Sequence, residues 1–277
     1  MGAAHGEVDA SDARGVIPNG CGSAAGVADA GEMGGDRSDG GEPEAGVGTG
    51  KFCAGFLRAD GRRGGAIQAI VARELDAKLM HVSTDYVFDG AKKQPCVEED
   101  GAAPLNVYGN TKLAGAAFLQ GDPEKYFIVR ASALYGKSPC RAKGGRNFVE
   151  LMLKLADERD ELRVVDDEIV SPTSTAALAK QIVILSRTNH YGLYRATAEG
   201  SCSWYDFAKA IFEATNTKVN LKVAGLNEFP AKVPRPKYPV LENGELKKRG
   251  LNALSNRQEG LRVYLCANVH HSRPAGS

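Results

Sequence analysis

The chain has 277 residues, a formal net charge of +1 and 43% hydrophobic residues. A chain of this length forms one large α/β domain or two small ones. The small, dispersed charge excludes a strongly basic nucleic-acid surface, and no apolar run of about 18 residues is present to span a membrane. Six widely spaced cysteines without a C-x-x-C pair exclude a zinc cluster and favour reduced thiols in a cytoplasmic protein.

The first 50 residues differ in composition from the rest. They hold 14 of the 33 glycines, nine acidic and two basic residues, and no aromatic residue. Such a segment cannot bury enough apolar surface to offset the conformational entropy lost on folding. We therefore expect a disordered low-complexity segment over 1–62, a folded region over 63–265 and a disordered tail over 266–277. Residues 1–62 can also be read as the product of a misassembled 5′ end of the gene.

Beyond residue 65, helical and extended hydrophobic patterns alternate, and beyond Gly250 the pattern weakens. Strands that alternate with helices predict an α/β fold with a mainly parallel, doubly wound sheet. The predicted helices are 66–75, 105–120, 148–156, 176–186 with a cap among 173–175, a helix that opens with Ser203-Trp-Tyr-Asp206, and 244–249; the predicted strands are 78–83, 126–130, 162–165 and 191–195.

The most informative segment is residues 81–90, HVSTDYVFDG. An apolar strand ends there in Ser-Thr-Asp, and open α/β sheets bind ligands at the carboxyl ends of their strands. The next predicted helix opens with Tyr108 and carries Lys112 about one turn later on the same face. This layout is typical of a site where a carbonyl is reduced.

Tyr108 and Lys112 together suit proton donation to a carbonyl oxygen. A nearby ammonium favours the phenolate and lowers the tyrosine pKa from about 10 toward neutrality, as a general acid requires. The lysine can also hydrogen-bond a ribose hydroxyl, and Thr84 can supply a second hydrogen bond that polarises the carbonyl. The Tyr-x-x-x-Lys spacing alone is common on helix surfaces, so its weight comes from the Ser-Thr-Asp strand end. Asp85 also suits a turn or cap, and Tyr86 suits a core aromatic.

Several other segments accompany these two in a fixed order. Together they make the chain similar to the dTDP-4-dehydrorhamnose reductase family of extended short-chain dehydrogenases/reductases, over about residues 66–250. The segments are 82–90 (VSTDYVFDG), 104–115 (PLNVYGNTKLAG), 129–130 with 134–136, 147–149 (NFV), 164–167 with 171–173, and 203–208 (SWYDFA).

The resemblance implies a Rossmann-like fold, truncated at its N-terminus, with a small C-terminal α/β portion that binds the substrate. It implies reduction of the 4-keto group of a dTDP-4-keto-6-deoxy sugar to dTDP-L-rhamnose, with NADPH or NADH and without a metal ion. Tyr108 would be the proton donor and Lys112 its partner, and both would contact the cofactor together with Ser83. Three residues would line the substrate site: Thr84, Asp85 and Tyr86.

The chain departs from the family at its N-terminus. The family begins with a strand and a G-x-x-G-x-x-G turn that binds the cofactor pyrophosphate. The nearest segment here, 46–50 (GVGTG), follows no apolar strand, so the usual anchor of the cofactor is missing. Without its first strands the sheet should also have an open edge at strand 79–82. A smaller departure is Ala133, where the family has a tryptophan.

A non-catalytic protein of the same fold is the alternative. The regulatory β subunit of methionine adenosyltransferase resembles this family and keeps a similar Ser-Asp-Tyr-Val-Phe-Asp-Gly run. Thr84 and the segments 171–173 and 203–205 favour reductase ancestry. The residue that would select NADPH or NADH belongs to the missing region. The sequence does not determine the oligomeric state; a homodimer is our expectation.

Overall fold

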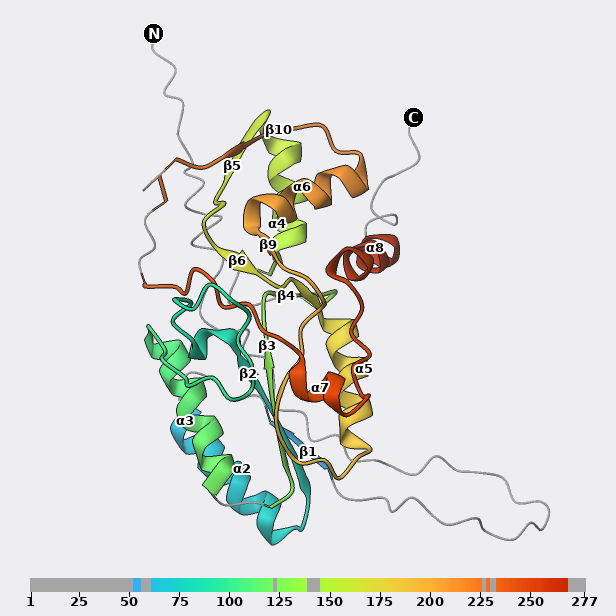
Figure 1. The fold of residues 1–277 in the computed structure, drawn as a ribbon. Helices are drawn as coiled ribbons and strands as arrows, with labels where there is room; N and C mark the ends of the chain where they lie inside the picture. The colour runs from blue at the N-terminus through green and yellow to red at the C-terminus, as the bar shows by residue number, and fades with distance from the viewer. Residues whose placement is uncertain are drawn as a thin grey trace, which may run out of the picture.

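The computed structural model describes residues 52–55, 61–121, 124–138, 145–225, 228–229 and 233–268, with side chains from residue 68 onward. A four-stranded parallel sheet organises this part of the chain, in the order β1-β2-β3-β8 (Figure 1). These strands are β1 (Phe52–Gly55), β2 (Lys78–Thr84), β3 (Tyr126–Ala131) and β8 (Gly192–Arg195).

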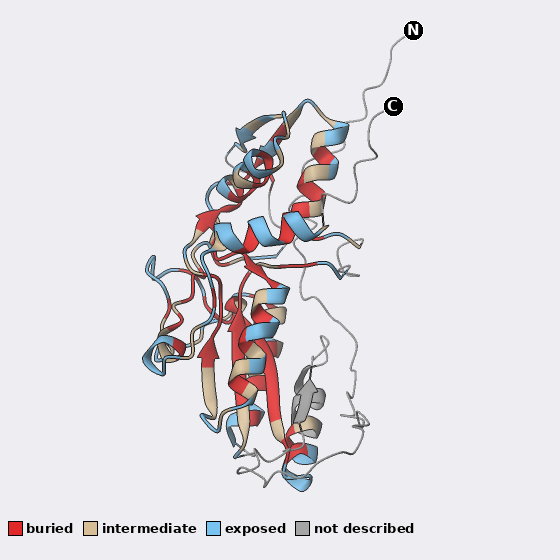
Figure 2. Ribbon diagram, turned by 90° about the vertical axis from the view of Figure 1, so that its right-hand side faces the viewer, coloured by how far each residue is buried: buried red, intermediate tan, exposed pale blue. Residues whose placement is uncertain are grey.

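Helices cover both faces of this sheet. The helices α2 (Gly61–Glu74) and α3 (Val107–Gly121) lie side by side on one face, and α5 (Thr175–Ser186) lies on the other (Figure 1). Figure 2 shows the strands almost fully buried between helices that expose their outer sides. The predicted doubly wound α/β fold is confirmed.

Alternation along β2 explains why both faces need cover. Leu79 packs with Leu119 of α3, whereas the next residue, Met80, packs with Leu185 of α5. Successive side chains of a strand point to opposite faces, so a continuous apolar run must be buried on both sides.

A smaller portion lies beyond the carboxyl ends of the strands, where β3 continues into β4 (Leu134–Tyr135) (Figure 1). Strands β5 (Glu161–Val164) and β10 (Asn220–Val223) pair in parallel there. Two short pairs, β4–β7 and β6–β9, complete this portion. The remaining elements are η1 (Asp85–Val87), α4 (Phe148–Glu158), β6 (Ile169–Val170), β7 (Thr173–Ser174), β9 (Cys202–Ser203), α6 (Trp204–Thr215), α7 (Gly244–Lys248) and α8 (Arg257–Asn268).

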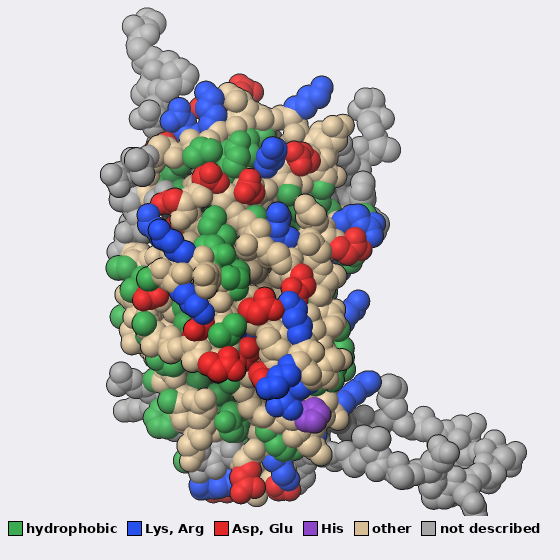
Figure 3. All heavy atoms as spheres, in the orientation of Figure 1, with side chains coloured by type: hydrophobic (Ala, Val, Ile, Leu, Met, Phe, Trp, Pro, Cys, Tyr) green, Lys and Arg blue, Asp and Glu red, His purple; other side chains and the backbone are tan. Residues whose placement is uncertain are grey.

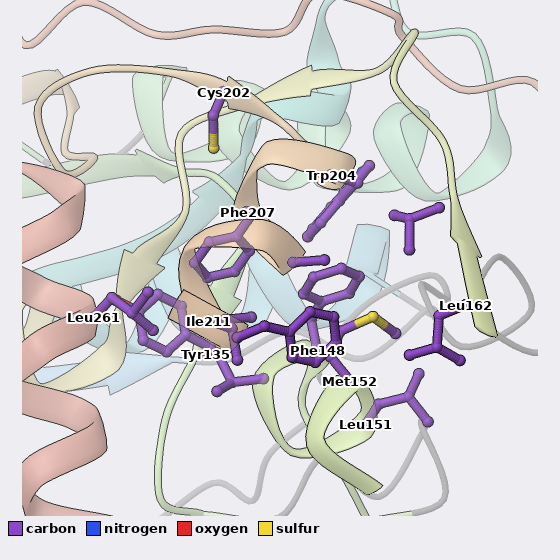
Figure 4. Packing of buried hydrophobic residues seen from close by; sticks show 14 of the residues in the cluster. Tyr135, Phe148, Leu151, Met152, Leu162, Cys202, Trp204, Phe207, Ile211 and Leu261 are labelled. Carbon is purple, nitrogen blue, oxygen red and sulfur yellow. The ribbon is translucent and has the colours of Figure 1, made fainter. Parts of the chain in front are cut away.

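Aromatic side chains form the core of this smaller portion. The Phe148 ring of α4 stacks on Phe207 of α6 at a centroid distance of 5.5 Å, and it lies 4.6 Å from the Trp204 ring (Figure 4). Ring pairs at such distances add about 0.5–1.5 kcal/mol each beyond the burial of their area. The Ser203 hydroxyl accepts the Asp206 N–H, which confirms the predicted N-cap of α6.

The expectation of an open edge on strand 79–82 is wrong. β1 pairs in parallel along β2, with Phe52 opposite Lys78 and Gly55 opposite His81. The sequence argument required an extended apolar strand before a glycine-rich turn, whereas the four residues of β1 already pair with the first four residues of β2.

The predicted cap of α5 among residues 173–175 is Ser174, although its side chain makes no capping hydrogen bond. Within the folded region predicted over 63–265, the sequence pattern indicated no helix beyond Gly250, whereas α8 packs Leu261, Tyr264 and Leu265 into the aromatic core. Gly260 and several charged residues weaken the helical pattern of α8, so its apolar stripe was overlooked.

Most of the predicted low-complexity segment 1–62, and all but the first three residues of the tail 266–277, lie outside the described residues, so these domain limits remain predictions. Among the described helices, none is long and apolar enough to cross a membrane. On the face shown in Figure 3, acidic and basic side chains are interspersed.

The N-cap of α4 supplies a stability test. Buried Asn147 forms a capping box with Glu150, and its Nδ2 donates to the Gly136 carbonyl (2.9 Å) and to the Tyr264 hydroxyl (2.8 Å). We expect Asn147→Ala to lower the free energy of unfolding by about 2–3 kcal/mol, because the cap and two buried hydrogen bonds are lost. Urea unfolding followed by circular dichroism measures this. The exposed Asn220→Ala is the control and should change stability by less than ~0.5 kcal/mol; equal losses in both variants would contradict the prediction.

Candidate active site

The carboxyl end of β2 is shaped by the hydroxyl of Thr84. Thr84 is the N-cap of η1, and its Oγ1 accepts the Tyr86 N–H at 3.2 Å. The same oxygen donates to Asp85 Oδ1 at 2.9 Å. These hydrogen bonds turn the chain out of the sheet directly after β2. They also fix the side chains of Thr84 and Asp85, two residues of the predicted site.

Asp85 is buried, with 4% of its surface exposed. Its Oδ2 accepts a 2.6 Å hydrogen bond from Ser132 Oγ, just beyond the end of the neighbouring β3. Burial raises the Asp85 pKa to about 6, although the hydrogen bonds from Ser132 and Thr84 lower it. Asp85 lies in the η1 turn, in agreement with the turn alternative, whereas the cap is Thr84; the predicted contact of Asp85 with substrate stays a prediction.

Helix α3 begins close against η1. The Asn106 side chain accepts the Gly109 N–H at 2.9 Å, which caps the helix, and its Nδ2 donates to the Pro234 carbonyl. A Cβ atom on Gly109 would overlap the Tyr86 carbonyl oxygen and lie 2.8 Å from the Pro104 side chain. Only glycine allows this close approach of helix and turn.

Lys112 connects α3 to the strand end. It is buried, and its Nζ donates to the Val82 carbonyl oxygen at 2.6 Å. Burial lowers the Lys112 pKa to about 8. An ammonium has three donors, so the group retains hydrogen bonds for a ligand after Val82 is satisfied.

Tyr108 lies one helical turn before Lys112, as the spacing predicts. Its ring, half-buried, contacts the Tyr86 ring edge-on at a centroid distance of 5.7 Å. Burial, then the nearby Asp85 carboxyl, raises the Tyr86 pKa, so Tyr86 stays neutral. The structure thus brings Thr84, Asp85 and Tyr86 together with Tyr108 and Lys112 at one strand end.

One further polar residue, His81, lies on the same face of β2 as the predicted Ser83. Both nitrogens of fully buried His81, and the Ser83 hydroxyl, have no hydrogen-bond partner among the described residues. Burial, and then the charge of Lys112, lowers the His81 pKa to about 3. The imidazole is therefore neutral. His81 lies two residues before Ser83, and residues two apart in a strand share a face. This spacing could have identified His81 from the sequence.

Two buried arginines that the sequence argument overlooked lie beside this row. Arg130 and Arg195 are opposite each other in the β3–β8 pair, and both guanidinium groups lie about 5 Å from the Phe88 ring centroid (5.1 and 5.0 Å). Arg195 Nη1 is 3.6 Å from Glu98 Oε2, and the Arg195 N–H donates to Glu98 Oε1. These contacts hold the segment after η1 against the sheet, because a buried cation requires compensation.

Ala133 adopts a left-handed backbone conformation with φ of 44°. This conformation is uncommon for a residue with a side chain. It turns the chain directly after Ser132, so that the Thr173 N–H can donate to the Ala133 carbonyl. Within the described residues no group of three or more His, Cys, Asp or Glu side chains is placed to hold a metal ion.

Comparison with known proteins assigns the chain to a family. A family model described as the RmlD substrate binding domain matches residues 62–269. The chain belongs to the RmlD-like dTDP-4-dehydrorhamnose reductase family of extended short-chain dehydrogenases/reductases. Residues 1–61 lie outside the match.

Individual relatives agree with this assignment. The chain is 39% identical over 197 residues to the spore coat polysaccharide biosynthesis protein SpsK of Bacillus subtilis, covering 71% of this chain and 67% of that one. It is 41% identical over 182 residues to dTDP-4-dehydrorhamnose reductase of Escherichia coli, covering 63% of this chain and 58% of the relative. The chain therefore spans less than two thirds of that reductase.

Solved structures show the same fold. The crystal structure of dTDP-4-dehydrorhamnose reductase from Bacillus anthracis in complex with NADP is 40% identical, with a TM-score of 0.71 over 75% of this chain and 72% of that one. A dTDP-glucose 4,6-dehydratase from the same organism, 14% identical with a TM-score of 0.64, shares the fold alone.

The contact between α3 and η1 can be tested at Gly109. We expect Gly109→Ala to destabilise the protein by about 2 kcal/mol or more, because the added methyl group meets backbone that cannot move aside. Chemical denaturation measures the change. Gly121→Ala is the matched control: it lies at the end of the same helix in open space and should be neutral or stabilise by up to ~1 kcal/mol. A Gly109→Ala protein as stable as the control would refute the close-packing argument.

Burial of neutral His81 predicts a pH effect on stability. Its pKa is about 3 in the folded chain and 6.5 in the unfolded chain, so only the unfolded state binds the proton between these values. Stability is lost as the pH falls below 6.5. Asp85, with a raised pKa, acts in the opposite direction between about pH 6 and 4.

We therefore expect His81→Leu to gain ~2 kcal/mol relative to wild type when the pH falls from 6.5 to 4.5, since one pKa unit corresponds to about 1.4 kcal/mol. The comparison cancels the contribution of Asp85, which both proteins share. Free energies of unfolding at several pH values check this, and parallel pH profiles for the two proteins would contradict it.

Proposed function

We propose that the chain is a sugar-nucleotide reductase that converts the 4-keto group of a dTDP-4-keto-6-deoxy sugar into a hydroxyl, as in the formation of dTDP-L-rhamnose, with NADPH or NADH. The observation that carries the proposal is the buried Lys112 ammonium, held by the Val82 carbonyl one helical turn from Tyr108. The reductase relatives support the substrate class, and the NADP complex of the Bacillus anthracis reductase supports the cofactor.

The residues present fit one half of such a cofactor. The Ser83 hydroxyl and the Lys112 ammonium are buried at a strand end with hydrogen-bonding capacity left, which suits ribose hydroxyls. The pyrophosphate half lacks its usual partner, because residues 56–60 after β1 read Phe-Leu-Arg-Ala-Asp and not a glycine-rich turn. When bound, the nicotinamide cofactor would supply the hydride.

The side chains of this protein would supply the proton. Tyr108 donates its phenolic proton to the carbonyl oxygen as the carbonyl carbon is reduced. Lys112, charged below its pKa of about 8, stabilises the phenolate that remains. Half-buried Tyr108 can then regain a proton from solvent. Thr84 and Tyr86 contact the sugar, and Asp85 belongs to the same wall.

A second candidate is a non-catalytic binding subunit of the same fold, and one observation favours it. The short strand β1 occupies the sheet edge without a glycine-rich turn behind it. Cofactor affinity separates the two candidates, because a binding subunit does not need NADPH.

The catalytic role of Tyr108 predicts a loss of turnover. We expect Tyr108→Phe to lower kcat for the dTDP-4-keto sugar by at least about 100-fold, because general acid catalysis is worth about 100- to 10,000-fold. Oxidation of NADPH followed at 340 nm measures turnover, and calorimetric titration with NADPH measures binding separately. Tyr191→Phe is the control, since its hydroxyl donates only to Asn189 before β8.

Three outcomes are informative. Turnover that survives Tyr108→Phe would refute the assignment of the proton donor. A folded chain that neither binds millimolar NADPH nor turns over would favour the binding subunit. Tight NADPH binding would show that the missing turn is replaced by other residues.

A further inference from the structure

Arg130 and Arg195 form a pair of buried cations to which the proposed reaction gives no part. They are opposite each other in the parallel β3–β8 pair, so their side chains lie on one face of the sheet. Ile128 and Leu193, two residues earlier on these strands, pack with Leu119, which identifies this face as the one that α3 covers. Arg130 is 6% exposed and Arg195 is 0% exposed.

Both guanidinium groups are charged. Burial, and then the charge of Arg195, lowers the Arg130 pKa to about 10, so Arg130 carries its proton at neutral pH. Burial also lowers the Arg195 pKa, while the nearby Glu98 raises it. Two like charges that are removed from water repel each other more strongly than they do in solvent. The pair therefore requires negative charge close by.

The acidic residues around the pair supply only part of this charge. Glu98 Oε2 is 3.6 Å from Arg195 Nη1, which is longer than a hydrogen bond, and Glu98 Oε1 accepts the Arg195 backbone N–H. Two other carboxylates act on Arg195 from a distance, but Glu99 is exposed and Asp100 binds Lys92 at 2.6 Å. Among the described residues, one carboxylate thus faces two guanidinium groups.

Hydrogen-bond donors are also left over. Nε and Nη1 of Arg130, and all three side-chain nitrogens of Arg195, are buried without a hydrogen-bond partner in the described part of the chain. The Phe88 ring, about 5 Å from both groups, offsets some of the charge but replaces no regular acceptor. The nearby Cys96 thiol is neutral, because burial raises its pKa. Buried donors in proteins nearly always have an acceptor, which can be an ion.

We propose that Arg130 and Arg195 form an internal binding site for one small monovalent anion, of which chloride is the physiological example. Chloride carries the missing negative charge and accepts hydrogen bonds from several N–H groups at once. The burial of both guanidinium groups, and of Phe88 at 3% exposure, favours such an ion over a phosphate. The ion would hold the segment after η1 against the sheet, because this segment carries Phe88 and Glu98. The site lies outside the proposed proton transfer, so its test needs no turnover.

The stability of the purified chain tests the proposal. Urea midpoints are measured in sodium chloride, sodium bromide and sodium gluconate at equal ionic strength, so that the screening of surface charges is the same. An ion that binds only the folded state stabilises it by mass action. Chloride and bromide should therefore raise the midpoint to a plateau, whereas the bulky gluconate should not. Equal midpoints in all three salts would overturn the proposal, because water would then satisfy the nitrogens.

Arg130→Met removes one cation and leaves Arg195 balanced by Glu98, while its unbranched side chain still fills the space beside Phe88. The chloride affinity should fall at least about 10-fold, as expected for the loss of a hydrogen bond between charged partners. Glu98→Gln has the opposite effect: it removes a competing negative charge and should raise the chloride affinity about 3-fold or more. Circular dichroism confirms that both variants are folded.

Arg262→Met is the matched control, since Arg262 is an exposed arginine that binds Glu259 on α8. This variant should keep the chloride dependence of the wild type. Line broadening of the ³⁵Cl resonance measures binding directly and should be lost in Arg130→Met alone of the three variants. A chloride dependence that survives Arg130→Met unchanged would overturn the proposal. Where Arg130→Met does not fold, Glu98→Gln decides, and an affinity that does not rise in it would overturn the proposal as well.

Discussion

The close approach of α3 to the end of β2 is the constraint on which the site depends. It exists because Gly109 has no side chain where the Tyr86 carbonyl oxygen lies. With helix and turn in contact, the Tyr108 ring meets Tyr86 and the Lys112 ammonium reaches the Val82 carbonyl. A helix displaced by one methyl group would separate these pairs, because hydrogen bonds weaken steeply beyond about 3.2 Å.

Burial of polar groups is the second theme of this edge of the sheet. Charged groups are costly to remove from water unless they are paired, and three of the buried charged groups at this edge have a specific partner. Lys112 binds a strand carbonyl, Asp85 binds two hydroxyls, and Arg195 faces Glu98 and Phe88. Such an arrangement holds a site in one geometry, which is what proton transfer over a single hydrogen bond requires.

The two halves of the proposed reductase site are unequally represented. The residues that we propose to act on the carbonyl, Thr84, Tyr108 and Lys112, lie together at the end of β2. The part that would bind the pyrophosphate has no G-x-x-G-x-x-G turn in the sequence after β1, and the chain spans 58% of the Escherichia coli relative. The affinity of this chain for NADPH is therefore the quantity that most directly compares it with the reductases of its family.

The sequence by itself determined the order and type of the main elements and the chemistry of the strand end. Period-two and period-3.6 patterns are local properties, so β2, α3 and α4 followed from neighbouring residues. The four-residue spacing of Tyr108 and Lys112 likewise specified one helix face.

Only the tertiary structure decided which residues meet across the chain. The pairing of β1 with β2, and the contact of Ser132 with Asp85 over 47 residues, depend on sheet order and on a backbone turn at Ala133. The surroundings of Asp85 show this: its Oδ1 binds the adjacent Thr84, which the sequence places beside it, whereas its Oδ2 binds Ser132, which only the fold brings near. No local pattern encodes such a long-range contact.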